Sequence, residues 1–157
     1  MKRRFIFLFF AFIFLLSCND NVLFDKNESI PNDTWAMSRK LSFEVNVKDT
    51  LTNYDFAINF RHTTKYPYSN ALFFITTFYP DNSVTQKDTI ECIVADSNGV
   101  WTGKGSGNLK DNRFRFARSV RFPRSGRYTF EIEQATRDTN LAGVSDVGLH
   151  IESVRTK

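Results

Sequence analysis

The stretch Tyr128-Thr129-Phe130-Glu131-Ile132-Glu133 alternates strictly between large apolar side chains and polar ones. Because successive side chains of a β-strand point to opposite faces of the sheet, this alternation predicts a strand with one buried and one solvated face. The turn-forming residues Pro123-Arg124-Ser125-Gly126 precede it. The stretch therefore indicates a sheet that buries one face against another layer of the protein.

Similar strand patterns cover most of the chain, and no segment has the apolar period of an amphipathic helix of useful length. Further strands are predicted at residues 41–47, 54–60, 71–79, 84–95, 113–122 and 147–151. The sequence thus predicts an all-β fold, an antiparallel β-sandwich of about seven to eight strands, Ig-like or jelly-roll-like. A closed barrel is the alternative.

The N-terminal residues have the composition of a secretory signal. Met1-Lys2-Arg3-Arg4 is followed by an apolar run over residues 5–16 and by Ser17-Cys18. The end of this segment, Leu15-Leu16-Ser17-Cys18, resembles the lipobox of bacterial lipoproteins, in which a signal peptidase cuts before the cysteine and the thiol carries diacylglycerol. An uncleaved membrane anchor is the weaker alternative, because the run has twelve residues and a spanning helix needs about 20.

The sequence divides into three parts. Residues 1–17 are expected to be a lipoprotein signal peptide, residues 18–33 a lipidated Cys18 with a polar tether, and residues 34–157 a single β-sandwich domain. A stable anchor needs more than one acyl chain, which a lipoprotein modification supplies. Cys18 therefore predicts attachment to a membrane of the cell envelope.

Charge and cysteine content argue against several classes of function. The precursor has 21 Lys and Arg against 17 Asp and Glu, but removal of residues 1–17 leaves 18 against 17. A nearly neutral mature chain has no electrostatic signature of nucleic-acid binding. With Cys18 committed to lipid, Cys92 has no disulfide partner and is expected to be a buried apolar residue.

No pattern predicts a catalytic centre, a metal site or a cofactor. His62, in a predicted loop, is expected to be solvated, and His150 to lie on the polar face of the last strand; neither has metal-ligand spacing. The stretch Gly103-Lys104-Gly105-Ser106-Gly107 matches neither the P-loop nor the dinucleotide fingerprint, and no helix follows it to receive a phosphate.

Glu131 and Glu133 share one strand face. Their separation of about 7 Å by the strand rise lies within the roughly 5–9 Å range of glycosidase carboxylates. Cross-strand ion pairing is the simpler interpretation. The expected basic partners are Arg113, Arg115, Arg121, Arg124 and Arg127.

Three aromatic residues, Tyr66, Tyr68 and Trp101, are predicted to lie in loops. Loop aromatics on a rigid sandwich are typical of a surface that binds a sugar or a protein partner. The alternative is that these rings fold back and cap the ends of the core.

Several segments, taken together and in order, resemble the GldH gliding motility lipoproteins. They are Cys18 in its lipobox, Tyr66-Pro67-Tyr68-Ser69-Asn70, Asp88-Thr89-Ile90-Glu91-Cys92, Trp101-Thr102-Gly103-Lys104-Gly105, Arg121-Phe122-Pro123, Tyr128-Thr129-Phe130-Glu131-Ile132-Glu133-Gln134 and Asp146-Val147-Gly148-Leu149. The resemblance implies a membrane-anchored accessory of bacterial gliding machinery, tied to type IX protein secretion, with no enzyme activity, cofactor or established ligand.

Three hypotheses follow. The favoured one is a non-enzymatic lipoprotein, held by lipid on Cys18 at the outer membrane and facing the periplasm, that contacts other gliding or type IX secretion proteins. The alternative is a cell-surface glycan-binding sandwich that uses Tyr66, Tyr68 and Trp101. The third is a hydrolase built on Glu131 and Glu133.

Overall fold

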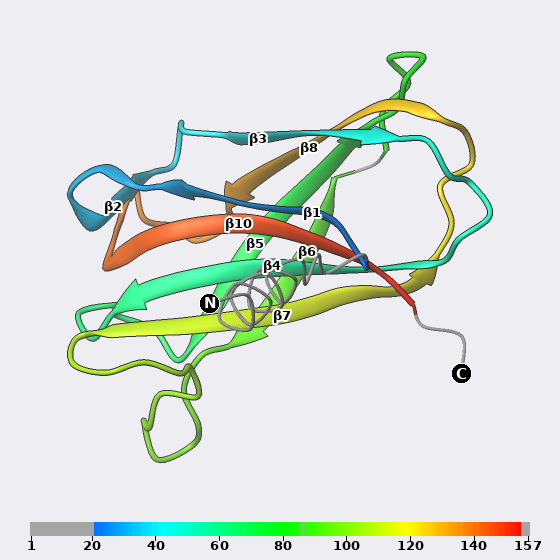
Figure 1. Cartoon of the computed structure of the whole chain (residues 1–157). Helices are drawn as coiled ribbons and strands as arrows, with labels where there is room; N and C mark the ends of the chain where they lie inside the picture. Colours follow the sequence, from blue (N-terminus) through cyan, green and yellow to red (C-terminus); the bar gives the residue numbers. More distant parts are fainter. Residues whose placement is uncertain (1–20, 86, 155–157) are drawn as a thin grey trace, which may run out of the picture.

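The chain folds as a two-layer antiparallel β-sandwich (Figure 1), which confirms the predicted fold class. The computed structural model describes residues 21–85 and 87–154. The predicted signal peptide and Cys18 lie outside the described residues. The two layers are separate four-stranded sheets, so the described strands do not close into one barrel.

The first sheet has the strand order β1-β10-β4-β7. Its strands are β1 (Val22–Ser29), β10 (Val144–Ser153), β4 (Tyr54–Thr63) and β7 (Leu109–Val120). All neighbours in this sheet are antiparallel, and β1 and β7 form its edges.

The second sheet has the order β3-β8-β5-β6. Its strands are β3 (Leu41–Val47), β8 (Gly126–Gln134), β5 (Asn70–Phe78) and β6 (Asp88–Ile93). A 3-10 turn, η2 (Pro31–Asp33), leads into β2 (Thr34–Ala36), which pairs with β9 (Asn140–Ala142) as a small separate sheet.

The core forms where the apolar faces of the two sheets meet. Tyr128, Phe130 and Ile132 of β8 are buried, as their alternation predicted, while the intervening polar residues lie on the outer face. The ring of Phe130 packs against Phe56 of β4 in the other layer, with 5.9 Å between ring centroids. Burial of these aromatic surfaces is the main force that holds the layers together.

The folded part begins earlier than the sequence analysis expected. Residues 22–29, assigned there to a tether, form β1 and pair with β10. On this edge strand Asp25 and Asn27 lie on the outer side of the sheet, whereas Phe24 packs against Phe43 of the second sheet. A polar edge strand and a polar tether have similar compositions, which explains the difference.

Candidate functional site: the polar face of the first sheet

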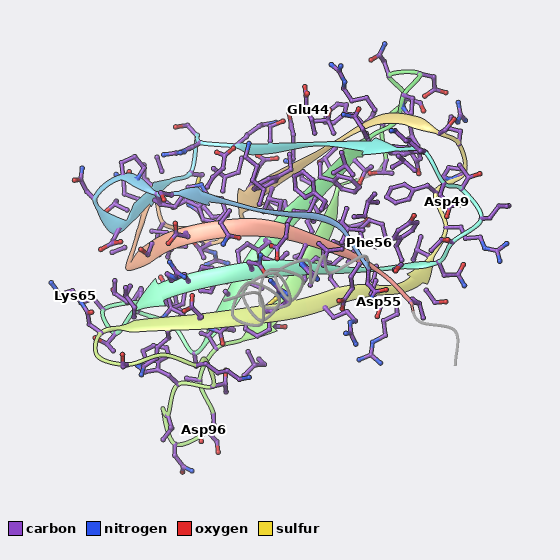
Figure 2. All side chains as sticks on the ribbon, in the orientation of Figure 1. Glu44, Asp49, Asp55, Phe56, Lys65 and Asp96 are labelled. Atoms are coloured by element: carbon purple, nitrogen blue, oxygen red, sulfur yellow. The ribbon has the colours of Figure 1, made fainter. Side chains whose placement is uncertain are left out.

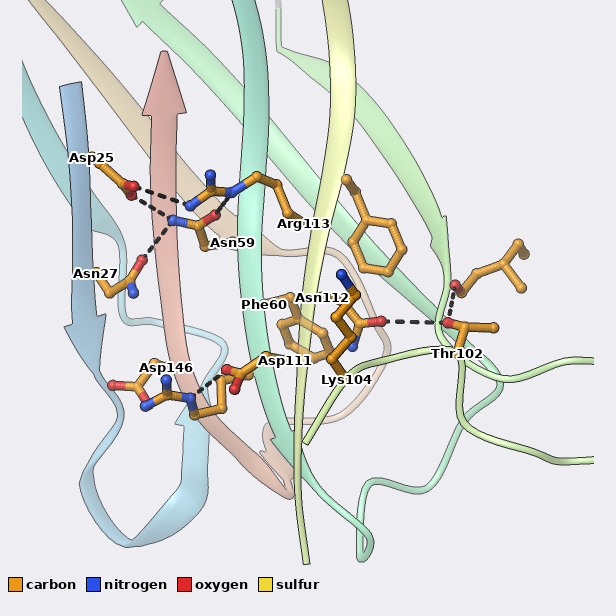
Figure 3. A pocket seen from close by; sticks show the side chains of 13 residues that line it. Asp25, Asn27, Asn59, Phe60, Thr102, Lys104, Asp111, Asn112, Arg113 and Asp146 are labelled. Atoms are coloured by element: carbon orange, nitrogen blue, oxygen red, sulfur yellow. Dashed lines mark hydrogen bonds and ion pairs between the residues drawn. The ribbon is translucent and has the colours of Figure 1, made fainter. Parts of the chain in front are cut away.

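The outer side of the first sheet carries polar and charged side chains from all four strands, which we call the polar face. Its members are Asp25, Asn27, Asp55, Asn59, Arg61, Asp111, Arg113, Arg115, Asp146, His150 and Glu152. A groove of about 950 Å³ lies over part of this face and is also lined by Thr102 and Lys104, from the connection between β6 and β7 (Figure 3).

Gly148 allows side chains of the polar face to meet across β10. In the strand register it lies between Asn27 of β1 and Asn59 of β4. Nδ2 of Asn59 donates a hydrogen bond to Oδ1 of Asn27 over this glycine, at 2.9 Å. A Cβ at position 148 would overlap Oδ1 of Asn27 and lie 2.5 Å from the carbonyl oxygen of Lys26. Close approach therefore requires glycine at this position.

Asp25 is the shared acceptor of the network (Figure 3). Its carboxylate accepts from Nδ2 of Asn59 at 2.9 Å and from Nη2 of Arg113 at 3.0 Å. Nδ1 of His150 lies 3.0 Å from the same carboxylate. Partial burial disfavours the charged form, but the hydrogen bond from Asn59, the adjacent His150 ring and the charge of Arg113 outweigh it. Together they hold the pKa of Asp25 below its ordinary value.

Two arginines of β7 connect this cluster to the rest of the polar face. Nε of Arg113 donates to Oδ1 of Asn59 at 2.7 Å. Arg115 pairs with Asp55 at 3.1 Å and with Glu152 at 3.5 Å. Each guanidinium group is thus tied to side chains of neighbouring strands.

A second cluster lies toward the other end of the same face. Arg61 hydrogen-bonds to Asp111 and pairs with Asp146 at 3.5 Å. Oγ of Ser29 donates to the same Asp146 at 2.7 Å. The polar face is therefore an ordered set of donors and acceptors with compensating charges, suited to contact with a polar partner.

The arrangement offers no evident metal centre. Within residues 21–85 and 87–154, no three His, Cys, Asp or Glu side chains are placed to hold a metal ion together. His150 lies on the polar face, as predicted.

His62 was predicted to be a solvated loop residue, and this was wrong. It lies in β4 with 0% of its surface exposed. Its Nδ1 lies 3.0 Å from the carbonyl oxygen of Thr63, and its Nε2 has no hydrogen-bond partner among the described residues. Its ring packs against Phe60, Tyr66 and Trp101. The alternating pattern of β4 continues two residues beyond the predicted strand end, which places His62 on the inner face.

The three predicted loop aromatics have different environments. Tyr66 is 3% exposed, packs against Phe60, and donates its hydroxyl to the carbonyl of Asn70 at 3.0 Å. It therefore caps the core instead of presenting a surface. Tyr68 is 39% exposed and donates to Asp138, while Trp101 is half-buried over His62. Only Tyr68 and Trp101 remain candidates for a binding surface.

Glu131 and Glu133 are ion-paired on the outer side of the second sheet. Lys40 lies 3.2 Å from Glu131 and 3.7 Å from Glu133, and Lys87 lies 2.8 Å from Glu133. The pairing was predicted, but the expected arginine partners were wrong. Arg113 and Arg115 belong to the other sheet, so their side chains are engaged on the polar face.

Cys92 is buried in the core, as predicted. Burial, together with the nearby charge of Glu91, raises the pKa of its thiol to about 12. A thiol with this pKa is a poor nucleophile at neutral pH, because almost none of it is thiolate.

Sequence reasoning did not single out the residues at the centre of the polar face. Asp25 and Asn27 lie in the segment assigned to a tether, and Asn59 occupies an ordinary polar position of an alternating strand. The available signal was Gly148, because a glycine inside a strand marks a place where another group approaches the backbone.

The fold and the polar face define an all-β sandwich protein with an ordered hydrogen-bonding surface. None of the described helices is long and apolar enough to cross a membrane. The sequence model of the GldH lipoprotein family matches residues 22–151. This chain belongs to the GldH lipoprotein family, as its motifs predicted, and the family indicates a membrane-anchored protein of the cell envelope.

Two relatives agree with this assignment. A protein of Christiangramia forsetii named gliding motility lipoprotein GldH homolog is 36% identical over 156 residues, which is 94% of this chain and 93% of the relative. The gliding motility lipoprotein GldH of Flavobacterium johnsoniae is 30% identical over 152 residues, 92% of this chain and 93% of the relative.

Among solved structures, the infectious bursal disease virus VP2 subviral particle has a TM-score of 0.32 and 17% identity, over 83% of this chain and 32% of that chain. A likeness at this level carries no argument about function.

Proposed function

We propose that this chain is a lipoprotein of the outer membrane, facing the periplasm, that serves gliding motility as a non-enzymatic accessory. The observation that carries the proposal is membership in the GldH lipoprotein family over residues 22–151, with relatives named for gliding motility. Lipid on Cys18 would confine the sandwich to two dimensions and raise its effective concentration for weakly binding envelope partners of the gliding and type IX secretion machinery.

The environments of the candidate catalytic residues support the proposal that the chain is not an enzyme. Glu131 and Glu133 are ion-paired on an outer sheet face, and the Cys92 thiol is buried. The polar face supports a contact function, since its paired charges and amide groups can exchange hydrogen bonds with a partner at modest desolvation cost.

A deletion strain tests this function when it is scored for both spreading motility and type IX cargo secretion. We expect loss of spreading, restored by the native chain but not by Cys18→Ala. Cells grown with radiolabelled fatty acid should label the native chain and leave the variant unlabelled. A deletion strain that glides normally would refute the motility role, and an unlabelled native chain would refute the anchor.

Glycan binding is a second candidate function. It is favoured by the position of Trp101 immediately before Thr102, which lines the groove of the polar face. The amide and guanidinium groups that line this groove, from Asn59, Asn112 and Arg113, can exchange hydrogen bonds with sugar hydroxyl groups. Retention on a glycan array should be lost in Trp101→Ala and Tyr68→Ala, and an intact protein with no hits would remove this candidate.

A further inference from the structure

At one end of the sandwich, the end of β10 and two loops lie beside the start of β1. The carbonyl oxygen of Asn21 accepts a hydrogen bond from the last residue of β10 at 2.7 Å. Next to it, the carbonyl oxygen of Asn53 accepts from the backbone of Val154 at 2.8 Å. The Asn53 side chain accepts from Nε of Arg121 at 2.8 Å and donates to Ser119 at 3.1 Å. The loops at this end are therefore tied together beside the first described residue.

This end exposes both apolar and basic side chains, and we call it the anchor-side end. Its members are Lys48, Leu51, Arg118, Val120, Arg121 and Val154, all of them exposed. Leu51 is 79% exposed, and the Asp49 carboxylate holds the turn that carries it by accepting the Leu51 amide at 2.7 Å. A leucine projecting from an ordered turn next to basic residues matches the chemistry of a membrane interface.

At the anchor-side end, some basic side chains have no acidic partner within residues 21–85 and 87–154. Asp55 and Glu152 are paired with Arg115, and Asp81 with Arg124. The side chains of Lys48 and Arg118 form no ion pair or hydrogen bond with the described residues. Asp49 is a nearby acidic residue without a basic partner in the described part of the chain. Its carboxylate oxygens accept hydrogen bonds from the Leu51 amide and the Thr52 hydroxyl of its own turn. Lys48 and Arg118 are thus available to an anionic surface.

The short chain between Cys18 and Asn21 limits how far this end can lie from a lipid on Cys18. Three peptide steps separate Cys18 from Asn21, and even fully extended they reach about 11 Å. The polar headgroup layer on one side of a bilayer is roughly 5–8 Å thick. A lipid on Cys18 therefore holds the anchor-side end within contact distance of the headgroups, with no tether long enough to lift it away.

We propose that the anchor-side end docks on the anionic phospholipid leaflet that holds the Cys18 lipid, with Leu51 at the headgroup boundary and Lys48 and Arg118 against phosphate groups. The inference rests on the proposed lipid anchor and adds an orientation to it. The ten residues of β4 span about 33 Å. The end of β4 and the loop after it lie opposite the start of β1 (Figure 1). Docking therefore presents this loop, which carries Tyr68, at that height, and it turns the polar face sideways toward neighbouring proteins.

The test uses the mature lipoprotein, purified from its own membranes with its lipid attached and reconstituted in vesicles. One set contains phosphatidylcholine alone, and the other contains phosphatidylcholine with about a third phosphatidylglycerol. An environment-sensitive fluorophore is placed at Leu51→Cys, or at Tyr68→Cys as the control at the opposite end. Buried Cys92 is not expected to be labelled in the folded protein.

We expect a blue shift and quenching by bromine-labelled lipid at position 51 in the anionic vesicles, and neither at position 68. Lys48→Glu with Arg118→Glu should reduce quenching at position 51 about three- to tenfold, to the level in neutral vesicles. The matched pair Lys65→Glu with Arg137→Glu makes the same charge change elsewhere and should leave quenching unchanged.

Equal signals at positions 51 and 68, or no dependence on anionic lipid, would overturn the docking while leaving the anchor intact. Loss of quenching in both charge-reversed pairs would overturn the assignment to this end. A native chain that does not enter either set of vesicles would overturn the anchor itself, and the docking with it. Self-association that buries position 51 in the absence of vesicles would assign this surface to a second copy instead.

Discussion

Asn59 on β4 donates a hydrogen bond to Asn27 on β1 across the strand between them, with 2.9 Å between Nδ2 and Oδ1. Neighbouring strands lie about 4.8 Å apart, so β1 and β4 are roughly 10 Å apart. Two short side chains close that distance only if they lie flat over Gly148. Side chains as well as backbone therefore hold the polar edge strand β1 on the sheet.

Replacing Gly148 with alanine should destabilise the sandwich. The new Cβ would overlap Oδ1 of Asn27 and press against the backbone oxygen of Lys26, so β1 must shift away from β10. We expect a loss of roughly 1–3 kcal/mol in the free energy of unfolding. Urea unfolding measures the loss, and hydrogen exchange should show it concentrated in β1.

The Gly148→Ala prediction has two controls. Gly99→Ala places a Cβ where no atom lies within 4 Å, so only the positive φ of 78° opposes it, and β1 should be unaffected. Adding Asn27→Gly to Gly148→Ala should recover part of the lost stability, because one of the two overlaps is removed. Equal protection of β1 in Gly148→Ala and the native chain would contradict the account.

Asn59→Asp should create a destabilisation that acid relieves. It places a second carboxylate at the position from which Asn59 donates to Asp25, at 2.9 Å. Two carboxylates at hydrogen-bonding distance repel until they share a proton. We expect a loss of about 1–2 kcal/mol at pH 7, moderated by solvent because the Asp25 side chain is 39% exposed.

The pH dependence of the free energy of unfolding tests whether carboxylate repulsion causes the destabilisation of Asn59→Asp. In the native chain the lowered pKa of Asp25 contributes stability above about pH 4, which is lost as pH falls through the folded-state pKa. In Asn59→Asp the repulsion raises the shared carboxyl pKa, so its deficit relative to the native chain should shrink between pH 7 and pH 4. Asn59→Ala, which loses the same hydrogen bonds without the repulsion, should keep a nearly constant deficit.

Tyr66 and Tyr68 should differ in their response to substitution, although only Pro67 separates them in the chain. Tyr66→Ala removes a buried ring and should cost roughly 3–5 kcal/mol of stability, whereas Tyr66→Phe removes one hydrogen bond and should cost about 1 kcal/mol. Tyr68→Ala should change the unfolding midpoint little, because the ring is partly exposed. A binding test that uses Tyr66→Ala would therefore measure unfolding, and a stable Tyr66→Ala would contradict the burial.

The alternation of apolar residues was sufficient to predict the sandwich, because it records which side of each strand is buried. Phe130 and Ile132 are examples of this direct relation. Alternation does not record which strands are neighbours. It therefore paired Glu131 and Glu133 with arginines that are near in sequence. In the fold Lys40 lies beside both carboxylates, and Lys87 lies beside Glu133.

The polar face was harder to predict for a related reason. Its centre joins Asp25, Asn59, Arg113 and His150, which come from four strands widely separated along the chain. Only the register of β1-β10-β4-β7 brings them together, and a single sequence does not encode that order in a local pattern. Charged side chains also lie at other places on the molecule, among them Glu44, Lys65 and Asp96 (Figure 2), so composition alone does not distinguish this face from the others.

His62 should make the stability of the sandwich depend on pH near neutrality. Burial lowers its pKa, and this outweighs the opposing influence of the Thr63 carbonyl. The unfolded chain therefore takes up the proton first, at a pKa of about 6.5. Stability is full above that pH and falls as the pH drops toward the folded-state pKa, by up to about 1.4 kcal/mol per pH unit.

His62→Phe tests this assignment, because phenylalanine keeps an aromatic ring against Phe60 and Trp101 but cannot take up a proton. The free energy of unfolding of the native chain, measured in urea, should fall between pH 7 and pH 5.5, and that of His62→Phe should stay nearly flat. Phe60→Leu, which weakens the same part of the core without removing a titratable group, should lower stability at both pH values and keep the native slope. If the free energy of unfolding of His62→Phe depends on pH as steeply as that of the native chain, another group must take up the proton, because phenylalanine cannot.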